Sequence, residues 1–125
     1  MNIIITLPNH LIEAIKTGRK TVEVRTDIPK NFNPEINCVF VCQKGTLEVP
    51  LSFTVKKFTY HYSWIDIREN ILDRVAVSSS FLYDYYQKRE FIYAWWIDQV
   101  SVLNPTLCLK RHFAVERAPQ RWVYA

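Results

Sequence analysis

Glycine is scarce in this sequence: only two of its 125 residues are glycine, Gly18 and Gly45. Glycine adopts backbone conformations with positive φ that cost other residues energy, so we expect each of the two at a turn. The chain also contains no internal repeat, low-complexity tract or interdomain linker, which excludes a solenoid or a tandem array. Hydrophobic residues make up 49% and charged residues 22%, the balance of a chain that folds around one core.

Cysteine is sparse as well. The chain has three cysteines, an odd number that does not suit a disulfide framework, and their spacing is not that of metal ligands. The three histidines, at positions 10, 61 and 112, are scattered. Residues four apart in a strand share one face, so Cys38 and Cys42 are expected to pack as small hydrophobic side chains. We therefore predict no disulfide framework, no metal site and no cofactor.

A long apolar run is missing too. The opening residues, MNIIITLP, have neither the basic leader of a signal peptide nor the ~20 apolar residues of a membrane span. These features predict a cytoplasmic protein that does not enter a membrane. A length of 125 residues suits one domain of the usual size, about 100–200 residues, so residues 1–125 are predicted to form a single domain.

Short apolar or alternating segments predict the strands. Glycine and polar residues at 43–46 predict a tight hairpin turn, and Pro105 is expected to end the segment 91–103. Residues 107–112 fit either a short strand or a turn. The segments expected to form strands are residues 3–5, 20–26, 38–42, 49–55, 91–103 and 122–124.

Apolar residues at spacings of three and four predict helices over residues 8–17, over 63–74 and after the serines at 78–80. Asn9 and the serines are suitable N-cap residues, and Gly18 suits a helix C-terminus. Strands that follow one another through tight turns favour an antiparallel sheet or small barrel. The predicted fold class is thus α+β, with about five or six mostly antiparallel strands and two or three helices.

Aromatic residues crowd the segment from Tyr60 to Trp64, inside the stretch 56–78 that gives the weakest pattern. Two interpretations remain open for Tyr60, Tyr62 and Trp64. Their rings stack on bases from a loop, where each base contributes about 1–3 kcal/mol, or they pack on one face of a strand.

Basic residues gather in two places, within residues 16–30 and within 110–121, and the net charge is +4. Such clusters suit a polyanionic partner, and they also suit an ordinary solvated surface. Charge alone does not separate the two.

Three stretches together resemble the ASCH family, whose members share the PUA-like β-barrel. Residues 18–25 are similar to the family signature G-x-K-x-x-E-x-R, and they follow the predicted first helix. Residues 81–86 and 93–97 resemble the late helix and the strand after it. Residues 103–107 with 117–124 resemble the R-x-P-Q-x-W-x-Y ending of bacterial and phage members. The stretches occur in the family's order and span nearly the whole chain, but residues 56–78 have no match.

The resemblance implies a polar cleft lined by Lys20, Glu23 and Arg25, with Gln120 and Arg121 beside it. A mobile lysine suits a phosphate, an arginine fork suits bidentate contacts, and a carboxylate accepts from an exocyclic amine. Strict alternation sets Lys20 opposite the other two, so convergence requires the strand to begin after Lys20. In the competing interpretation Glu23 and Arg25 form a surface ion pair worth about 0–1 kcal/mol.

Some ASCH-like proteins are amidohydrolases that remove an acetyl group from a modified cytidine, using a lysine, a threonine three residues later and a glutamate further on. Here Lys20 matches the lysine, but Glu23 replaces the threonine, and acyl transfer to a carboxylate gives a labile anhydride. Thr21 is close in sequence but at another position. The resemblance therefore implies an RNA- or nucleotide-binding domain. An amidohydrolase acting on an acylated cytidine-type nucleoside and a protein-binding accessory domain remain as alternatives, and the oligomeric state is left undetermined.

Overall fold

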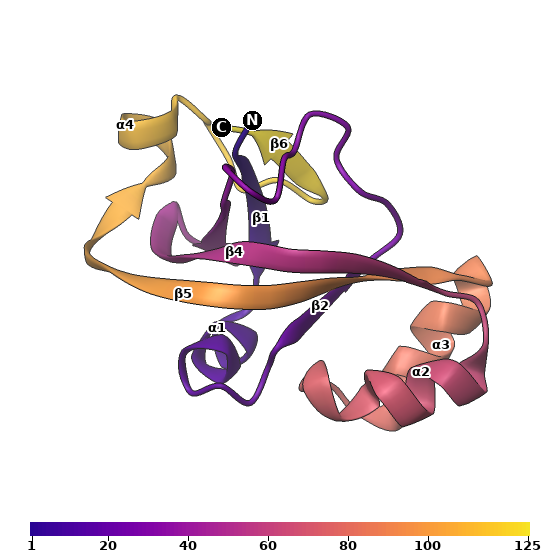
Figure 1. The fold of residues 1–125 in the computed structure, drawn as a ribbon. Coiled ribbons are helices and arrows are strands. Elements are labelled where there is room, and N and C mark those ends of the chain that lie inside the picture. Colours follow the sequence, from indigo (N-terminus) through magenta and orange to yellow (C-terminus); the bar gives the residue numbers. More distant parts are fainter.

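Six strands form one mixed sheet in the computed structural model, which describes residues 1–125 (Figure 1). The order across the sheet is β2-β5-β4-β3-β1-β6, and every neighbouring pair is antiparallel except β1 and β3. The sheet curls into a half-barrel, so β2 and β6 are its two free edges. The predicted α+β class is confirmed. The strands are β1 (Ile3–Leu7), β2 (Val22–Arg25), β3 (Val39–Gln43), β4 (Glu48–His61), β5 (Ile92–Cys108) and β6 (Trp122–Tyr124).

Four α-helices and one 3-10 turn accompany the sheet, which is more than the two or three helices predicted. Pro8, not Asn9, is the N-cap of the first helix, and Asn9 is its first helical residue. The additional helix, α4, occupies part of the segment expected to be a strand or a turn. The helices are α1 (Asn9–Lys16), α2 (Trp64–Asn70), η1 (Leu72–Arg74), α3 (Ser79–Arg89) and α4 (Leu109–Phe113). None of them is of a length and apolarity that would carry it through a membrane.

The long β4–β5 ribbon is the element whose extent the sequence patterns missed. β4 continues to His61, through residues 56–61 that have no family match. The prediction that Pro105 ends the other strand is wrong, since β5 runs on to Cys108. A register shift explains this: β5 pairs with β4 at Val102 and again at Leu107, and Pro105 lies between these pairs. A proline there breaks no ladder hydrogen bond.

Two hydrophobic clusters lie on opposite faces of the ribbon. One contains Trp95 with apolar residues of β1, β3 and β4, and the other contains Val22 and Ala94 under α2 and α3. Trp95 is buried and Trp96 half-buried, as expected for neighbours on a strand. In Figure 1, α2 and α3 cover one end of the ribbon while α1 lies beside β2. The result is a helix on each flank of the β2 edge.

Both glycines lie at turns, as the sequence predicts. Gly18 and Gly45 have φ of 80° and 81°, the left-handed conformation expected at the end of α1 and in the β3–β4 turn. Cys42 is buried in β3, and burial raises the pKa of its thiol to about 11. Cys38 is only half-buried and precedes β3.

Ser78 caps α3, because its hydroxyl accepts a hydrogen bond from the Phe81 backbone N–H at 3.2 Å. Replacing Ser78 with Ala is expected to lower the free energy of unfolding by about 1 kcal/mol, the usual value of an N-cap. Ser79→Ala is the matched control, since Ser79 is the first helical residue and its side chain caps nothing. Chemical denaturation checks both variants, and equal effects would contradict the assignment of the cap.

Candidate functional site

An open cavity of about 390 Å³ lies where the half-barrel fails to close. Its walls come from both sides of the gap: β2 at one sheet edge, β1 and β6 at the other, and α1 and α3 on the flanks. All five residues predicted for the polar cleft are among those that line it. The complete lining is Leu7, Leu11, Lys20, Glu23, Val24, Arg25, Thr26, Asp27, Val77, Phe81, Tyr85, Arg89, Gln120, Arg121 and Trp122.

Lys20 converges with Glu23 because β2 begins only at Val22, which leaves Lys20 outside the alternation of the strand. Its side chain is 1% exposed, and its ammonium has three acceptors. Nζ donates to the Val22 carbonyl at 2.8 Å and to the Val75 carbonyl at 3.0 Å, and it lies 3.0 Å from Glu23 Oε1. An ammonium has three protons. The expectation of a mobile, ligand-ready lysine is therefore wrong.

Glu23 is 4% exposed and lies between two cations. Its Oε1 pairs with Lys20, and its Oε2 accepts from Arg25 Nε at 2.8 Å. Burial alone would raise the pKa of this carboxyl, but the charges and hydrogen bonds of Lys20 and Arg25 outweigh burial and lower it. The interpretation of Glu23 and Arg25 as a mere surface pair is also wrong, because this is a buried three-residue ionic cluster.

Arg25 continues the cluster across the gap in the sheet. Its Nη1 donates to the backbone carbonyl of Arg121 at 2.9 Å, and Arg121 in turn pairs with Asp27. These contacts connect β2 to the segment just before β6, although the two strands share no backbone ladder. Arg25 Nη2 has no protein partner and remains able to donate.

Helix α3 contributes three cavity residues that were not predicted from the sequence to belong to the site. Phe81, Tyr85 and Arg89 follow one another at intervals of four, so they lie along one helix face. Arg89 packs its guanidinium over the Tyr85 ring at 3.9 Å and donates only to the Tyr85 carbonyl. It has no carboxylate partner. The i, i+4 spacing was available in the sequence, but it did not indicate which helix face meets the cavity.

The cavity wall combines charge with aromatic surface. Four basic and two acidic side chains line it, an excess of two positive charges. Trp122 packs against the core and also lines the cavity. Its Nε1 is shielded from solvent and has no acceptor within the protein. An unpaired buried donor of this kind is costly unless a ligand or water accepts from it.

Tyr60, Tyr62 and Trp64 do not line this cavity. Tyr60 contacts Tyr62 with ring centroids 5.8 Å apart, whereas Trp64 opens α2 and packs on Tyr83 at 5.0 Å. The interpretation in which all three pack on one strand face is wrong, because β4 ends at His61. Whether any of these rings stacks on a base stays a prediction.

Comparison with known proteins bears on the fold. No family model matches the chain, and no curated protein matches it in sequence. The crystal structure of a single-substitution variant of an ASCH protein from Zymomonas mobilis superposes with a TM-score of 0.83 and 18% identity, covering 99% of this chain and 87% of that one. The unsubstituted protein gives 0.78 at the same identity and coverage. The chain has the fold of an ASCH domain. The hypothetical protein PH0355 is a more distant neighbour, at a TM-score of 0.56 and 21% identity over 76% of this chain and 95% of that one.

This ASCH fold is expected to depend on the charge of Glu23. Glu23→Gln leaves Lys20 and Arg25 without their counter-charge, so the free energy of unfolding should fall by about 3–5 kcal/mol near neutral pH. The folded-state pKa lies below the ordinary value of 4.5, so the stability due to the carboxylate is fully present above that value. It is lost as pH falls through the folded-state pKa.

Chemical denaturation of the wild type and of Glu23→Gln at a series of pH values provides the measurement. The difference between their free energies of unfolding should be constant from pH 8 to about 5 and should narrow under more acidic conditions. Glu13→Gln is the control, because Glu13 forms an exposed pair with Lys16 at 3.4 Å and should contribute less than about 1 kcal/mol. A difference in free energy of unfolding that increased on acidification would contradict the lowered pKa of Glu23.

Proposed function

We propose that this ASCH-like chain binds a nucleotide, or the terminal nucleotide of an RNA, in the cavity between β2 and β6. The carrying observation is that three different kinds of group meet in one cavity: the fixed carboxylate of Glu23, the unpaired guanidinium of Arg89 and an aromatic wall. A volume of about 390 Å³ is within the usual range for small-molecule sites, about 300–1,000 Å³.

Glu23 is suited to recognise the base. Each of its oxygens accepts one contact from Lys20 or Arg25, and a carboxylate oxygen has a second lone pair for an exocyclic amine. Because Lys20 and Arg25 hold it on both sides, Glu23 loses little conformational freedom when a ligand binds. Phe81, Tyr85 and Trp122 supply ring surface to the same cavity.

Arg89 and Arg25 are suited to the phosphate. Lys20 and Arg25 share the single charge of Glu23, and Arg121 is paired with Asp27, so the excess positive charge of the cavity belongs to the Lys20–Glu23–Arg25 cluster and to Arg89. Arg25 still has its free Nη2, and the Arg89 fork is engaged at a single nitrogen. Guanidinium groups bind phosphate through two parallel hydrogen bonds. Lys20 therefore supports the site by holding Glu23 in place.

The same geometry argues against hydrolysis of an acylated cytidine. A general base works best with a pKa near the working pH, whereas the Glu23 carboxyl has a lowered pKa. The Lys20 ammonium has no free proton, and Thr21 lies outside the cavity lining. Binding makes use of these groups as they stand.

The direct test of binding targets Arg89. Arg89→Ala is expected to weaken binding of nucleoside monophosphates about tenfold or more, because a charge-assisted hydrogen bond contributes about 1.5–3 kcal/mol. Binding should also weaken as salt rises, and the variant should show a smaller salt dependence. Titration calorimetry with the four common ribonucleoside monophosphates at two salt concentrations measures both effects.

Lys88→Ala is the control, since Lys88 adjoins Arg89 in sequence but does not line the cavity. The corresponding nucleosides, which lack the phosphate, should bind the wild type and Arg89→Ala alike. Absence of binding at micromolar protein, or an equal loss in the two variants, would refute the proposal.

Hydrolysis is tested by incubating the wild-type protein with N4-acetylcytidine and assaying released acetate. We expect no release above the uncatalysed rate, because neither Lys20 nor Glu23 is in a state suited to acid–base catalysis. Release that disappears in Lys20→Ala would establish the amidohydrolase alternative instead.

A further inference from the structure

Two rows of side chains run across β2, β5 and β4 on one face of the sheet, and both begin at the cavity. Residues directly opposite one another on antiparallel strands project to the same face. Glu23 is opposite Trp95, which is opposite Phe58; Arg25 is opposite Tyr93, which is opposite Tyr60. The first row thus starts at the carboxylate of the site, and the second starts at its arginine.

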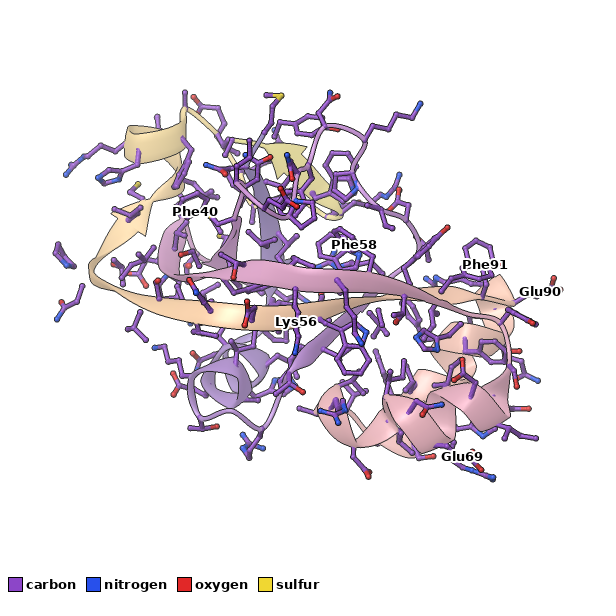
Figure 2. All side chains as sticks on the ribbon, viewed as in Figure 1. Phe40, Lys56, Phe58, Glu69, Glu90 and Phe91 are labelled. Carbon is purple, nitrogen blue, oxygen red and sulfur yellow. The ribbon has the colours of Figure 1, made fainter.

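The first row is covered. Phe32, from the loop between β2 and β3, is buried and packs edge-on against Phe58 with centroids 6.1 Å apart. The Trp95 indole donates to the Asp27 carbonyl of the same loop at 3.2 Å. Phe58 projects from β4 toward the side of the ribbon where this loop runs (Figure 2). Trp95 is buried and Phe58 is half-buried, so this row offers less open ring surface than the second.

The second row is open and ends in a larger aromatic cluster. The Tyr60 ring contacts Tyr93, Phe91 and Tyr62, with centroids 5.2, 5.5 and 5.8 Å away. Tyr60 is 49% exposed and Tyr62 is 71% exposed. Phe91 lies at the end of the β4–β5 ribbon that is farther from α4 (Figure 2). We name the row Arg25, Tyr93, Tyr60, Phe91 and Tyr62 the aromatic track.

We infer that the aromatic track is the path of a single-stranded RNA whose terminal nucleotide occupies the cavity. The inference rests on the proposed function and deepens it. The aromatic track leads away from the cavity that holds Arg25 and Arg89. This arrangement suits a single-stranded nucleic acid, since its bases can stack on the rings and its terminal phosphate can contact the arginines. Acceptors at the cavity, Asp27 Oδ1 and the Gln120 amide, are able to take a ribose 2′-hydroxyl, a group that DNA lacks.

Trp64 is not part of the track. It packs on Tyr83 and Tyr86, between α2 and α3, and it is separated from the rings that contact Tyr60. Of the three aromatic residues singled out in the sequence, Tyr60 and Tyr62 therefore belong to the aromatic track, and Trp64 packs α2 against α3.

The experiment compares a mononucleotide with an oligonucleotide on the same variants. Fluorescence anisotropy follows a labelled short single-stranded RNA of mixed sequence, and calorimetry follows the nucleoside monophosphate that binds the wild type best. Tyr60→Ala with Tyr62→Ala should weaken RNA binding about tenfold or more, since stacking of each base is substantial, while the mononucleotide affinity stays within about twofold. Tyr83→Ala is the matched control: it is also an exposed tyrosine, but it lies off the track.

Two further variants guard against a folding defect. Tyr62→Ala alone removes the most exposed ring of the track, and Tyr60→Phe keeps the stacking surface, so the first should still weaken RNA binding and the second should not. Unchanged RNA affinity in Tyr60→Ala with Tyr62→Ala, while the mononucleotide still binds, would overturn the track alone. Failure of the mononucleotide to bind the wild type would overturn the proposed function itself. Equal affinity for single-stranded DNA or for duplex RNA of the same sequence would also overturn the assignment to single-stranded RNA.

Discussion

The carboxylate of Glu23, buried between Lys20 and Arg25, is the interaction on which the site depends. A charge removed from water is costly unless it is paired and hydrogen-bonded, and here both oxygens are engaged. The two cations bring further elements with them. Lys20 holds the Val75 carbonyl next to η1, and Arg25 holds the Arg121 carbonyl ahead of β6. One carboxylate thus positions three segments that are distant in sequence.

The ionic cluster also accounts for the position of the cavity. In a closed barrel the edge strands β2 and β6 would share backbone hydrogen bonds, but this sheet leaves them apart. Side-chain contacts from Arg25 and Arg121 cross the gap in their place. Two strands joined through side chains lie farther apart than two strands joined by backbone hydrogen bonds. The space between β2 and β6 is therefore wide enough to form a cavity. The proposed ligand site exists because the edge strands β2 and β6 do not pair to close the barrel.

Sequence patterns predicted the local elements best where one physical signal dominated. Gly18 and Gly45 were placed at turns by their backbone freedom, Ser78 at a helix start by its hydroxyl, and residues 122–124 in a strand by their apolar character. The patterns failed at Pro105, where a register shift removed the need for an N–H, and in residues 56–61, where long-range pairing with β5 extends a strand of mixed polarity. Both failures arise from interactions with a distant strand, which local propensity does not report.

For the site, the sequence by itself determined which polar groups are present and, through the family resemblance, that Lys20, Glu23, Arg25, Gln120 and Arg121 belong together. Their charge states and roles were decided only by the tertiary structure. Burial with three acceptors turned Lys20 from a mobile ligand group into a support, and the absence of a partner left Arg89 as the free cation. The reason is physical: a side chain's residual capacity to bind depends on the partners and the solvent around it, and both are set by contacts between residues far apart in the chain.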